Sequence, residues 1–303
     1  MRSFICLILG SFMIITLSCH GGGKQKKDQD VFTVPDSVMN EEPTLLEEEV
    51  TEDIIDNLAS PVEIADLLNR LSIPFSMGYL YPSKMVSDLN TDIQKAYGLG
   101  IYGADLGYQA MYGKNTQILD YISNIKDLSE DLKIGQFFDF NTLKRLSSSK
   151  SNLDSLMFIA THSFNDIDKY LRKQGRGEIS AMIITGLWLE GMYLATQLQQ
   201  DHPKPELKER IGEQKLILED LFTLLDRYKG NREISDLLKK LTPLKELYGD
   251  VKITVTPGEP ETVEKDGRLV IIQHEESKTE YTDELLQQIT ENFKSLREGI
   301  VGK

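Results

Sequence analysis

Two stretches of sequence, YGLGIYGADLGYQAMYG (residues 97–113) and ISAMIITGLWLEGMYLAT (residues 179–196), decide the fold. Both are rich in glycine and alanine, and both have the apolar spacing of a buried helix. Glycine inside a helix costs about 1 kcal/mol relative to alanine, so the cost of Gly100, Gly103 and Gly107 must be offset elsewhere. Close approach of two helices offsets it most simply. The sequence therefore predicts glycine-rich helices that pack tightly against a neighbour.

The two stretches repeat one pattern, 85 residues apart. Each contains a carboxylate, then a tyrosine three residues later, then an alanine two residues beyond the tyrosine. The residues are Asp105, Tyr108 and Ala110 in the first stretch and Glu190, Tyr193 and Ala195 in the second. A second amphipathic segment follows each stretch, which favours a weak helical-hairpin repeat. The expected fold class is all-α, either a helical bundle or a short array of helical hairpins, with tetratricopeptide-like pairs as one form.

Helical periodicity continues over most of residues 44–248. Asn231 is expected to cap the last helix of this region, and Pro243 to interrupt it. A final amphipathic helix is expected to begin at Thr282 or Asp283. Besides an early helix that ends at Ile73-Pro74, the sequence predicts helices over 84–113, 116–133, 141–146, 151–174, 178–200, 206–228 and 232–248.

The pattern changes before that final helix. Residues 251–256 (VKITVT) alternate with period two, which is typical of a strand. Asp266-Gly267 lies between two further extended runs and is the strongest short-range hairpin signal in the chain. The sequence therefore predicts a small β-hairpin near residues 251–273, inserted before the last helix.

The amino terminus has the composition of a secretory signal. Arg2 is followed by an apolar run, residues 4–17, that is shorter than the roughly 20 apolar residues a membrane span needs. The sequence TLSC (residues 16–19) resembles the lipobox of bacterial lipoproteins, with Thr16 where that family usually has leucine. In that family the cysteine thiol receives a diacylglycerol and the signal is cut before the cysteine. The resemblance implies lipidation of Cys19 and attachment to a membrane.

If Cys19 is lipidated, the chain divides into a signal peptide (1–18), a lipidated cysteine with a flexible tether (19–45) and a helical domain (46–303). The tether is polar, charged and interrupted by proline, so it cannot bury enough surface to fold. Cys6 would leave with the signal, and the thiol of Cys19 would be occupied by lipid. The domain would therefore fold on its hydrophobic core without a disulfide.

The formal net charge of −14 bears on partners. A strongly acidic domain is repelled by nucleic acid and by anionic lipid head groups, so neither is expected to bind it. The membrane partner is reached instead through the lipid on Cys19. The expected location is the cell envelope, with the outer membrane favoured and the face left open.

A second resemblance comes from YGADL (residues 102–106) and GLWLEGMYLATQ (residues 186–197), taken with the lipobox. These segments resemble an uncharacterised family of lipoproteins from Bacteroidetes-type bacteria, over about residues 60–230. The resemblance implies an envelope location and a helical fold, and it brings no activity.

The candidate site is a pair of carboxylates, Asp105 and Glu190, each in an apolar helix with a tyrosine on its own face. If the two helices pack together, the pair could line a pocket with Tyr108, Tyr193 and Trp188. Such a pair could act as acid and base on a glycan, or bind a cation or amine. The favoured alternative is that each is a buried carboxylate satisfied by a tyrosine or an arginine, which fixes the helix register.

Other chemical signals are weaker. The four histidines show no metal-ligand spacing, so no metal or cofactor is predicted. Gly175-Arg176-Gly177 precedes a helix and could hold an anion, although an ordinary turn is favoured. Core packing is favoured over sugar or peptide stacking for a group of aromatic residues, namely Tyr79, Tyr81, Tyr97, Tyr102, Tyr108, Tyr112, Trp188 and Tyr193.

The leading hypothesis is a non-catalytic, lipid-anchored envelope protein, an adaptor or accessory subunit that binds another envelope protein through its helical surface. The alternatives are a ligand-binding lipoprotein with a pocket near Asp105 and Glu190 and, less favoured, a glycan hydrolase that uses the same two carboxylates.

Overall fold

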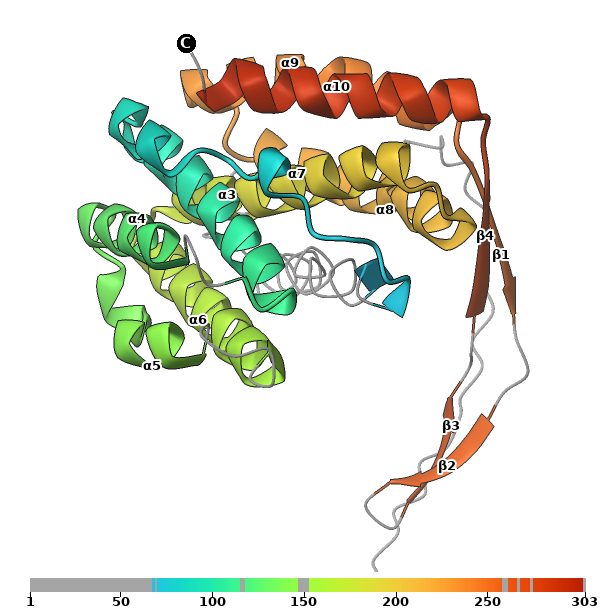
Figure 1. Ribbon diagram of the computed structural model, residues 1–303, viewed down its shortest axis with the longest axis horizontal. Coiled ribbons are helices and arrows are strands. Elements are labelled where there is room, and N and C mark those ends of the chain that lie inside the picture. The colour runs from blue at the N-terminus through green and yellow to red at the C-terminus, as the bar shows by residue number, and fades with distance from the viewer. Residues whose placement is uncertain are drawn as a thin grey trace, which may run out of the picture. The chain divides into compact units, whose positions relative to one another are not determined.

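A computed structural model describes residues 67–68, 70–114, 118–146, 153–257, 261–265, 268–272 and 275–301 (Figure 1). The predicted signal peptide, the tether with Cys19 and the first part of the predicted helical domain lie outside these residues, as does most of the helix predicted to end at Ile73-Pro74. The described α-helices are α3 (Asp92–Met111), α4 (Ile118–Asp131), α5 (Phe140–Leu146), α6 (Leu153–Lys173), α7 (Gly177–Asp201), α8 (Pro205–Asp226), α9 (Arg232–Gly249) and α10 (Asp283–Val301). Short 3-10 helices are η1 (Met77–Tyr79), η2 (Ser83–Asp88) and η3 (Gly135–Phe137). The predicted all-α class is confirmed.

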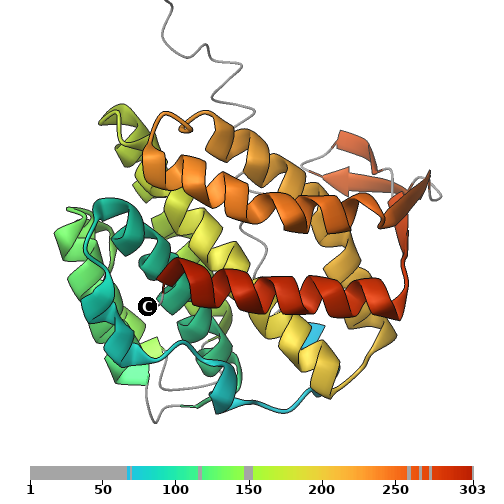
Figure 2. The ribbon, with the colours of Figure 1, turned by 90° about the horizontal axis from the view of Figure 1, so that it is seen from above.

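Helix α7 lies at the centre of the bundle and packs against α3, α6, α8 and α10 (Figures 1 and 2). Within the described part of the chain, α7 alone is long and apolar enough to cross a membrane by length and composition. However, 89% of its most apolar window is buried inside the protein. Its apolar character is therefore that of a core helix.

Helices α3 and α7 meet backbone against backbone at two glycines. A Cβ atom on Gly100 would lie 2.1 Å from the carbonyl oxygen of Ile183, and one on Gly186 would lie 2.1 Å from the carbonyl oxygen of Tyr97. Neither backbone oxygen can move aside cheaply, because each belongs to a packed helix. The predicted close approach of a glycine-rich helix is therefore confirmed at Gly100.

The other glycines of α3 have different surroundings. A Cβ on Gly103 would make an ordinary contact of 3.8 Å with Leu187, and a Cβ on Gly107 would meet no atom of a described residue within 4 Å. Among the described residues, the expected close packing is therefore found at Gly100 and not at these two glycines. The two stretches that share a sequence pattern are direct neighbours, with α4 packed on α3 and α8 packed on α7.

Helix α3 begins later than the sequence periodicity indicates. The helix predicted from residue 84 is interrupted, since η2 covers its first residues and α3 starts at Asp92. Thr91 and Gln94 form a capping box, in which the Gln94 N–H donates to Thr91 Oγ1 (3.1 Å) and the Thr91 N–H donates to Gln94 Oε1 (3.2 Å). This cap satisfies the first free N–H groups of α3 and fixes where it begins.

Helix α9 runs through Pro243 without a break, which corrects the predicted interruption. Pro243 is exposed, and so is Lys239, whose carbonyl loses its helical donor there. Water can bond that carbonyl, while the buried side chains of Leu241 and Leu244 hold the helix in place. The predicted cap is confirmed, because the Glu233 N–H donates to Asn231 Oδ1 at 2.9 Å.

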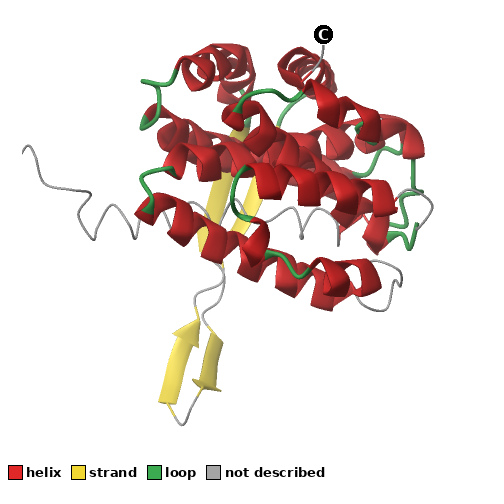
Figure 3. Cartoon of the chain, turned by 90° about the vertical axis from the view of Figure 1, so that its left-hand side faces the viewer, coloured by secondary structure: helices red, strands yellow, loops and turns green. Residues whose placement is uncertain are grey.

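The strands form two antiparallel ribbons (Figure 3). Strand β2 (Glu261–Lys265) pairs with β3 (Arg268–Ile272), with Lys265 opposite Arg268, so the predicted pairing of the two extended runs is confirmed. Asp266 and Gly267 themselves lie outside the described residues. Strand β1 (Lys252–Pro257) pairs with β4 (Glu275–Glu280), which lies beyond the predicted end of the hairpin at residue 273. Strand β4 has the sequence EESKTE, without apolar alternation, and so gave no strand signal.

The ribbon of β1 and β4 is fixed to α8 at its base. Thr279 Oγ1 donates to the carbonyl of Glu209 (3.2 Å), and the hydroxyl of Tyr281 donates to the carbonyl of Lys208. Gly212 makes room for this contact, because a Cβ there would lie 2.7 Å from the Tyr281 ring.

Candidate functional site

The structure brings Asp105 and Glu190 together inside the protein. Both side chains are fully buried, with 0% exposure. Asp105 lies on α3 and accepts a hydrogen bond from the backbone N–H of Tyr81, at 2.8 Å to Oδ2. Glu190 lies on α7, within hydrogen-bond reach of the Asp105 carboxyl group. The expectation that the two helices pack together is confirmed.

Arg297 of α10 is the partner of this acid pair. Its Nε donates to Glu190 Oε2 (2.8 Å) and its Nη2 donates to Glu190 Oε1 (2.7 Å). Nη2 also donates to the carbonyl of Tyr79, at 2.9 Å. A bidentate bond between a guanidinium and a carboxylate is among the strongest and most directional contacts in proteins. Arg297 thus connects α10 with α7 and with the segment that precedes α3.

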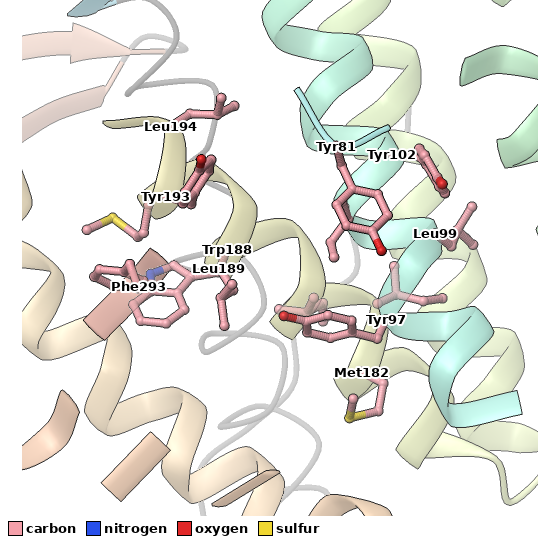
Figure 4. Packing of buried hydrophobic residues seen from close by; sticks show 14 of the residues in the cluster. Tyr81, Tyr97, Leu99, Tyr102, Met182, Trp188, Leu189, Tyr193, Leu194 and Phe293 are labelled. Atoms are coloured by element: carbon pink, nitrogen blue, oxygen red, sulfur yellow. The ribbon is translucent and has the colours of Figure 1, made fainter. Parts of the chain in front are cut away.

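Two tyrosine rings enclose the Arg297 guanidinium. Its central carbon lies 5.0 Å from the ring centre of Tyr81 and 4.2 Å from that of Tyr193. Figure 4 shows Tyr193 on α7 and Tyr81 on the segment before α3. A cation over an aromatic face gains about 2 kcal/mol or more when water is excluded. The predicted pocket residue Tyr193 therefore contacts a side chain of the protein itself.

The electrostatics of the three charged groups are interdependent. Burial raises the pKa of Asp105 well above its usual range, and the charge of Glu190 adds to this, while Arg297 acts in the opposite direction. Burial also raises the pKa of Glu190, opposed by the charge and hydrogen bonds of Arg297. Burial alone would lower the pKa of Arg297, but the charge of Glu190 and its hydrogen bonds raise it. Asp105 is therefore the member that most readily holds a proton.

The segment before α3, residues 71–91 (hereafter the 71–91 segment), is held by side-chain hydrogen bonds. It contains two 3-10 helices but little regular structure, so its buried backbone groups need other partners. Those partners come mainly from tyrosines of α3 and α4. The bonds run from Tyr121 to the Tyr81 carbonyl (2.6 Å), from Asn124 to the Ser83 carbonyl (2.8 Å), from Tyr102 to the Pro82 carbonyl (3.2 Å) and from Tyr112 as donor, just after α3, to the Ile73 carbonyl (2.7 Å).

Tyr108 and Trp188 have other roles than lining a space at the acid pair. The Tyr108 hydroxyl accepts the Ser76 N–H (2.9 Å), and its ring stacks on Phe75 with centres 5.1 Å apart. Trp188 donates from Nε1 to Gln214 Oε1 (3.0 Å) and packs edge-on against Phe293 (Figure 4). Trp188 is two residues from Glu190, and two residues turn a helix by about 200°, so the two side chains leave α7 on different sides.

The sequence predicts a tyrosine or an arginine as the partner of each buried acid, but it does not identify Arg297. A signal for it exists in α10, whose buried residues Leu285, Ile289 and Phe293 follow each other at four-residue spacing. The next position of that apolar stripe is Arg297. An arginine where the helical period requires an apolar residue indicates a buried ion pair.

A separate cleft of about 210 Å³ lies between α3, α7 and α9. Its apolar lining includes Tyr97, whose buried hydroxyl has no hydrogen-bond partner among the described residues. Polar groups at its rim bind the protein itself, since Glu233 accepts from the Thr91 hydroxyl (2.9 Å) and Lys240 donates to the Gly299 carbonyl (2.9 Å). The volume is below the roughly 300 Å³ at which ordinary ligand pockets begin.

The turn before α7 binds the protein's own groups. Arg176 donates to the carbonyl of Leu132 (3.0 Å) and to the carboxylate of Asp92 (3.3 Å). Within the described ranges, no group of three histidine, cysteine, aspartate or glutamate side chains is placed to hold a metal ion.

No family model, curated protein or solved structure gives a significant match to the chain.

Proposed function

We propose that this chain is a non-catalytic lipoprotein of the bacterial cell envelope, anchored through lipid on Cys19, whose helical domain binds another envelope protein. The anchor rests on the lipobox-like sequence TLSC (residues 16–19) after a short apolar run. Together with YGADL (residues 102–106) and GLWLEGMYLATQ (residues 186–197), this sequence supports membership of a lipoprotein family of Bacteroidetes-type bacteria.

The non-catalytic role rests on the surroundings of the acid pair. A glycoside hydrolase needs one carboxyl group at the leaving oxygen of the sugar and one that reaches water or the sugar ring. Asp105 and Glu190 have no exposed surface, and Arg297 occupies both oxygens of Glu190. A substrate could reach this pair only if an element packed on it, such as α10 or the 71–91 segment, moved away. The observation that carries the proposal is therefore the closed contact of Glu190 with Arg297.

The anchor is tested by changing its cysteine. Cys19→Ala should release the protein from membranes, because the lipid that holds it can no longer be attached. Cys6→Ala is the matched control, since Cys6 lies in the apolar run and should leave attachment unchanged. Both variants are expressed in the native host and membranes are washed with alkaline carbonate. Retention of Cys19→Ala after the wash would refute the lipid anchor.

The partner is tested with the full-length lipidated protein. Cross-linking in native membranes, affinity purification and mass spectrometry should give one stoichiometric envelope protein. The unanchored Cys19→Ala variant, mixed with detergent-solubilised membranes, separates direct binding from mere co-residence in one membrane. Absence of a partner in both preparations would contradict the adaptor role.

One structural observation favours the alternative that this protein binds a ligand, namely the cleft beside Tyr97. If no partner is found, a thermal-shift screen of small amphipathic compounds is the next test. A hit should be lost on Leu237→Trp, which would fill the cleft from α9.

A further inference from the structure

The acid pair carries one more negative charge than its surroundings neutralise. Among the described residues, Glu190 and Arg297 are the charged side chains that act on Asp105. Two carboxylates and one guanidinium would leave an uncompensated negative charge with no access to water. A buried ion without a partner is strongly disfavoured, and the usual outcome is that the group binds a proton.

The oxygen atoms show where that proton belongs. Both oxygens of Glu190 accept hydrogen bonds from Arg297. Asp105 Oδ2 accepts the Tyr81 N–H, whereas Asp105 Oδ1 has no donor in the described part of the chain. The two carboxyl groups are within hydrogen-bond reach of each other. A proton on Oδ1 would give that atom a hydrogen-bond partner, because the O–H would donate to Glu190. The charges of the three side chains would then sum to zero.

We infer that Asp105 and Glu190 form a binding site for a single proton, carried by Asp105, and that this proton holds the 71–91 segment and α10 against α3 and α7. Asp105 binds the 71–91 segment through Tyr81, and Glu190 binds α10 through Arg297. Loss of the proton places two negative charges side by side at the junction of all four elements. The contacts that join the elements there are then weakened together.

None of the other titratable groups around the junction replaces Asp105 as the carrier of this proton. They are mostly tyrosines, which carry no charge at neutral pH, and the carboxylates among them are not fully buried. The groups are Tyr97, Tyr102 and Tyr108 on α3, Tyr79, Tyr81 and Asp88 on the 71–91 segment, Asp120 and Tyr121 on α4, Tyr193 and Asp201 on α7, and Arg297 and Glu298 on α10.

The pH dependence follows from the direction of the shift. Because the pKa of Asp105 is higher in the folded than in the unfolded chain, its stabilising effect is complete below the ordinary value of 3.8. The effect is lost as the pH rises through the folded pKa. A rise in pH should therefore speed amide hydrogen exchange in the 71–91 segment and α10 beyond the general base-catalysed increase.

The test uses Asp105→Asn in the full chain. An asparagine amide can accept from Tyr81 and donate to Glu190, so it imitates the protonated acid permanently. The wild-type protein at neutral pH should show the infrared C=O band of a protonated carboxyl group, and the variant should lack it. As the pH is raised from about 5 towards the base-induced unfolding transition, the melting temperature of the variant should fall less than that of wild type. Asp127→Asn, at an exposed position on α4, is the matched control and should behave as wild type.

Two results would overturn the inference. One is a wild-type spectrum without the protonated band, or a band that aspartate-selective carbon labelling fails to shift; this measurement needs no variant to fold. The other is a melting temperature of Asp105→Asn that depends on pH in the same way as that of wild type. Glu190→Gln gives an independent check, since Arg297 would then face Asp105 alone, and the band should disappear as Asp105 ionises.

Discussion

At the scale of residues, Arg297 explains why two acids can lie inside an apolar bundle. Its contacts with Glu190 and Tyr79 and its position between two aromatic rings replace the water that each charge has lost. The sequence indicated both acids, because each interrupts an apolar helix. The apolar stripe of α10 marks Arg297 as a member of some buried ion pair. The sequence could not join it to Glu190, because the two residues are 107 positions apart and no local rule connects them.

Removal of the arginine should be costly. Arg297→Ala is expected to destabilise the fold by about 3–5 kcal/mol, because Glu190 is left as a buried charge without a cation. The measurement is the free energy of unfolding in urea. Lys294→Ala, at an exposed position of the same helix, should change it by less than about 0.5 kcal/mol.

The double variant Glu190→Gln with Arg297→Met gives a further check. It should be less destabilised than the sum of the two single variants, since neither partner then leaves the other uncompensated. A purely additive result would show that the two side chains do not stabilise the fold as a pair.

A single tyrosine hydroxyl should matter in the same way. Tyr121→Phe removes the donor to the buried Tyr81 carbonyl and should cost about 1–3 kcal/mol. Tyr170→Phe, at a half-buried position away from the 71–91 segment, should cost clearly less. Equal effects of the two changes on the urea midpoint would contradict this role of Tyr121.

At the scale of elements, the crossing of α3 and α7 depends on where glycine is needed and where it is only tolerated. Glycine content predicted close packing, but the sequence alone does not say which of several glycines faces the neighbour. Gly100 faces the backbone of α7, whereas Gly107 has no close neighbour in the described part of the chain. Helix beginnings were easier to predict where a cap is present, as at Asn231, and the missed start of α3 was also marked, by Thr91 and Gln94.

Alanine at the two glycines should therefore have opposite effects. Gly100→Ala should destabilise the fold by about 1–3 kcal/mol or more, because the new methyl group meets a backbone oxygen. Gly107→Ala should stabilise it by up to about 1 kcal/mol, the difference in helix propensity. Thermal unfolding of both variants decides this, and a loss of stability with Gly107→Ala would contradict the assigned contacts.

At the scale of the whole molecule, stability depends on aromatic hydroxyl groups that must stay neutral. Burial raises the pKa of Tyr81 and of Tyr108 to about 12. This part of the stability is complete below the ordinary tyrosine pKa of 10 and is lost as the pH rises through about 12. The sequence showed the aromatic cluster but not its bonds, because their acceptors are backbone groups of an irregular segment.

In a base titration, ionisation of these tyrosines should therefore accompany unfolding. Tyrosinate absorbance and helical circular dichroism should change over the same pH range, well above 10. Full tyrosinate absorbance near pH 10 in a protein that is still helical would contradict the buried positions.

The contact between Arg297 and Tyr79 also has a consequence for biosynthesis, because it joins residues 218 positions apart. A ribosome completes the two acids of α3 and α7 long before it adds the arginine that neutralises them. Any chain that stops short of α10 therefore keeps Glu190 without its cation and the carbonyl of Tyr79 without its donor. Copies that end before α10 should therefore be less stable, and more readily degraded by proteases, than chains that contain it.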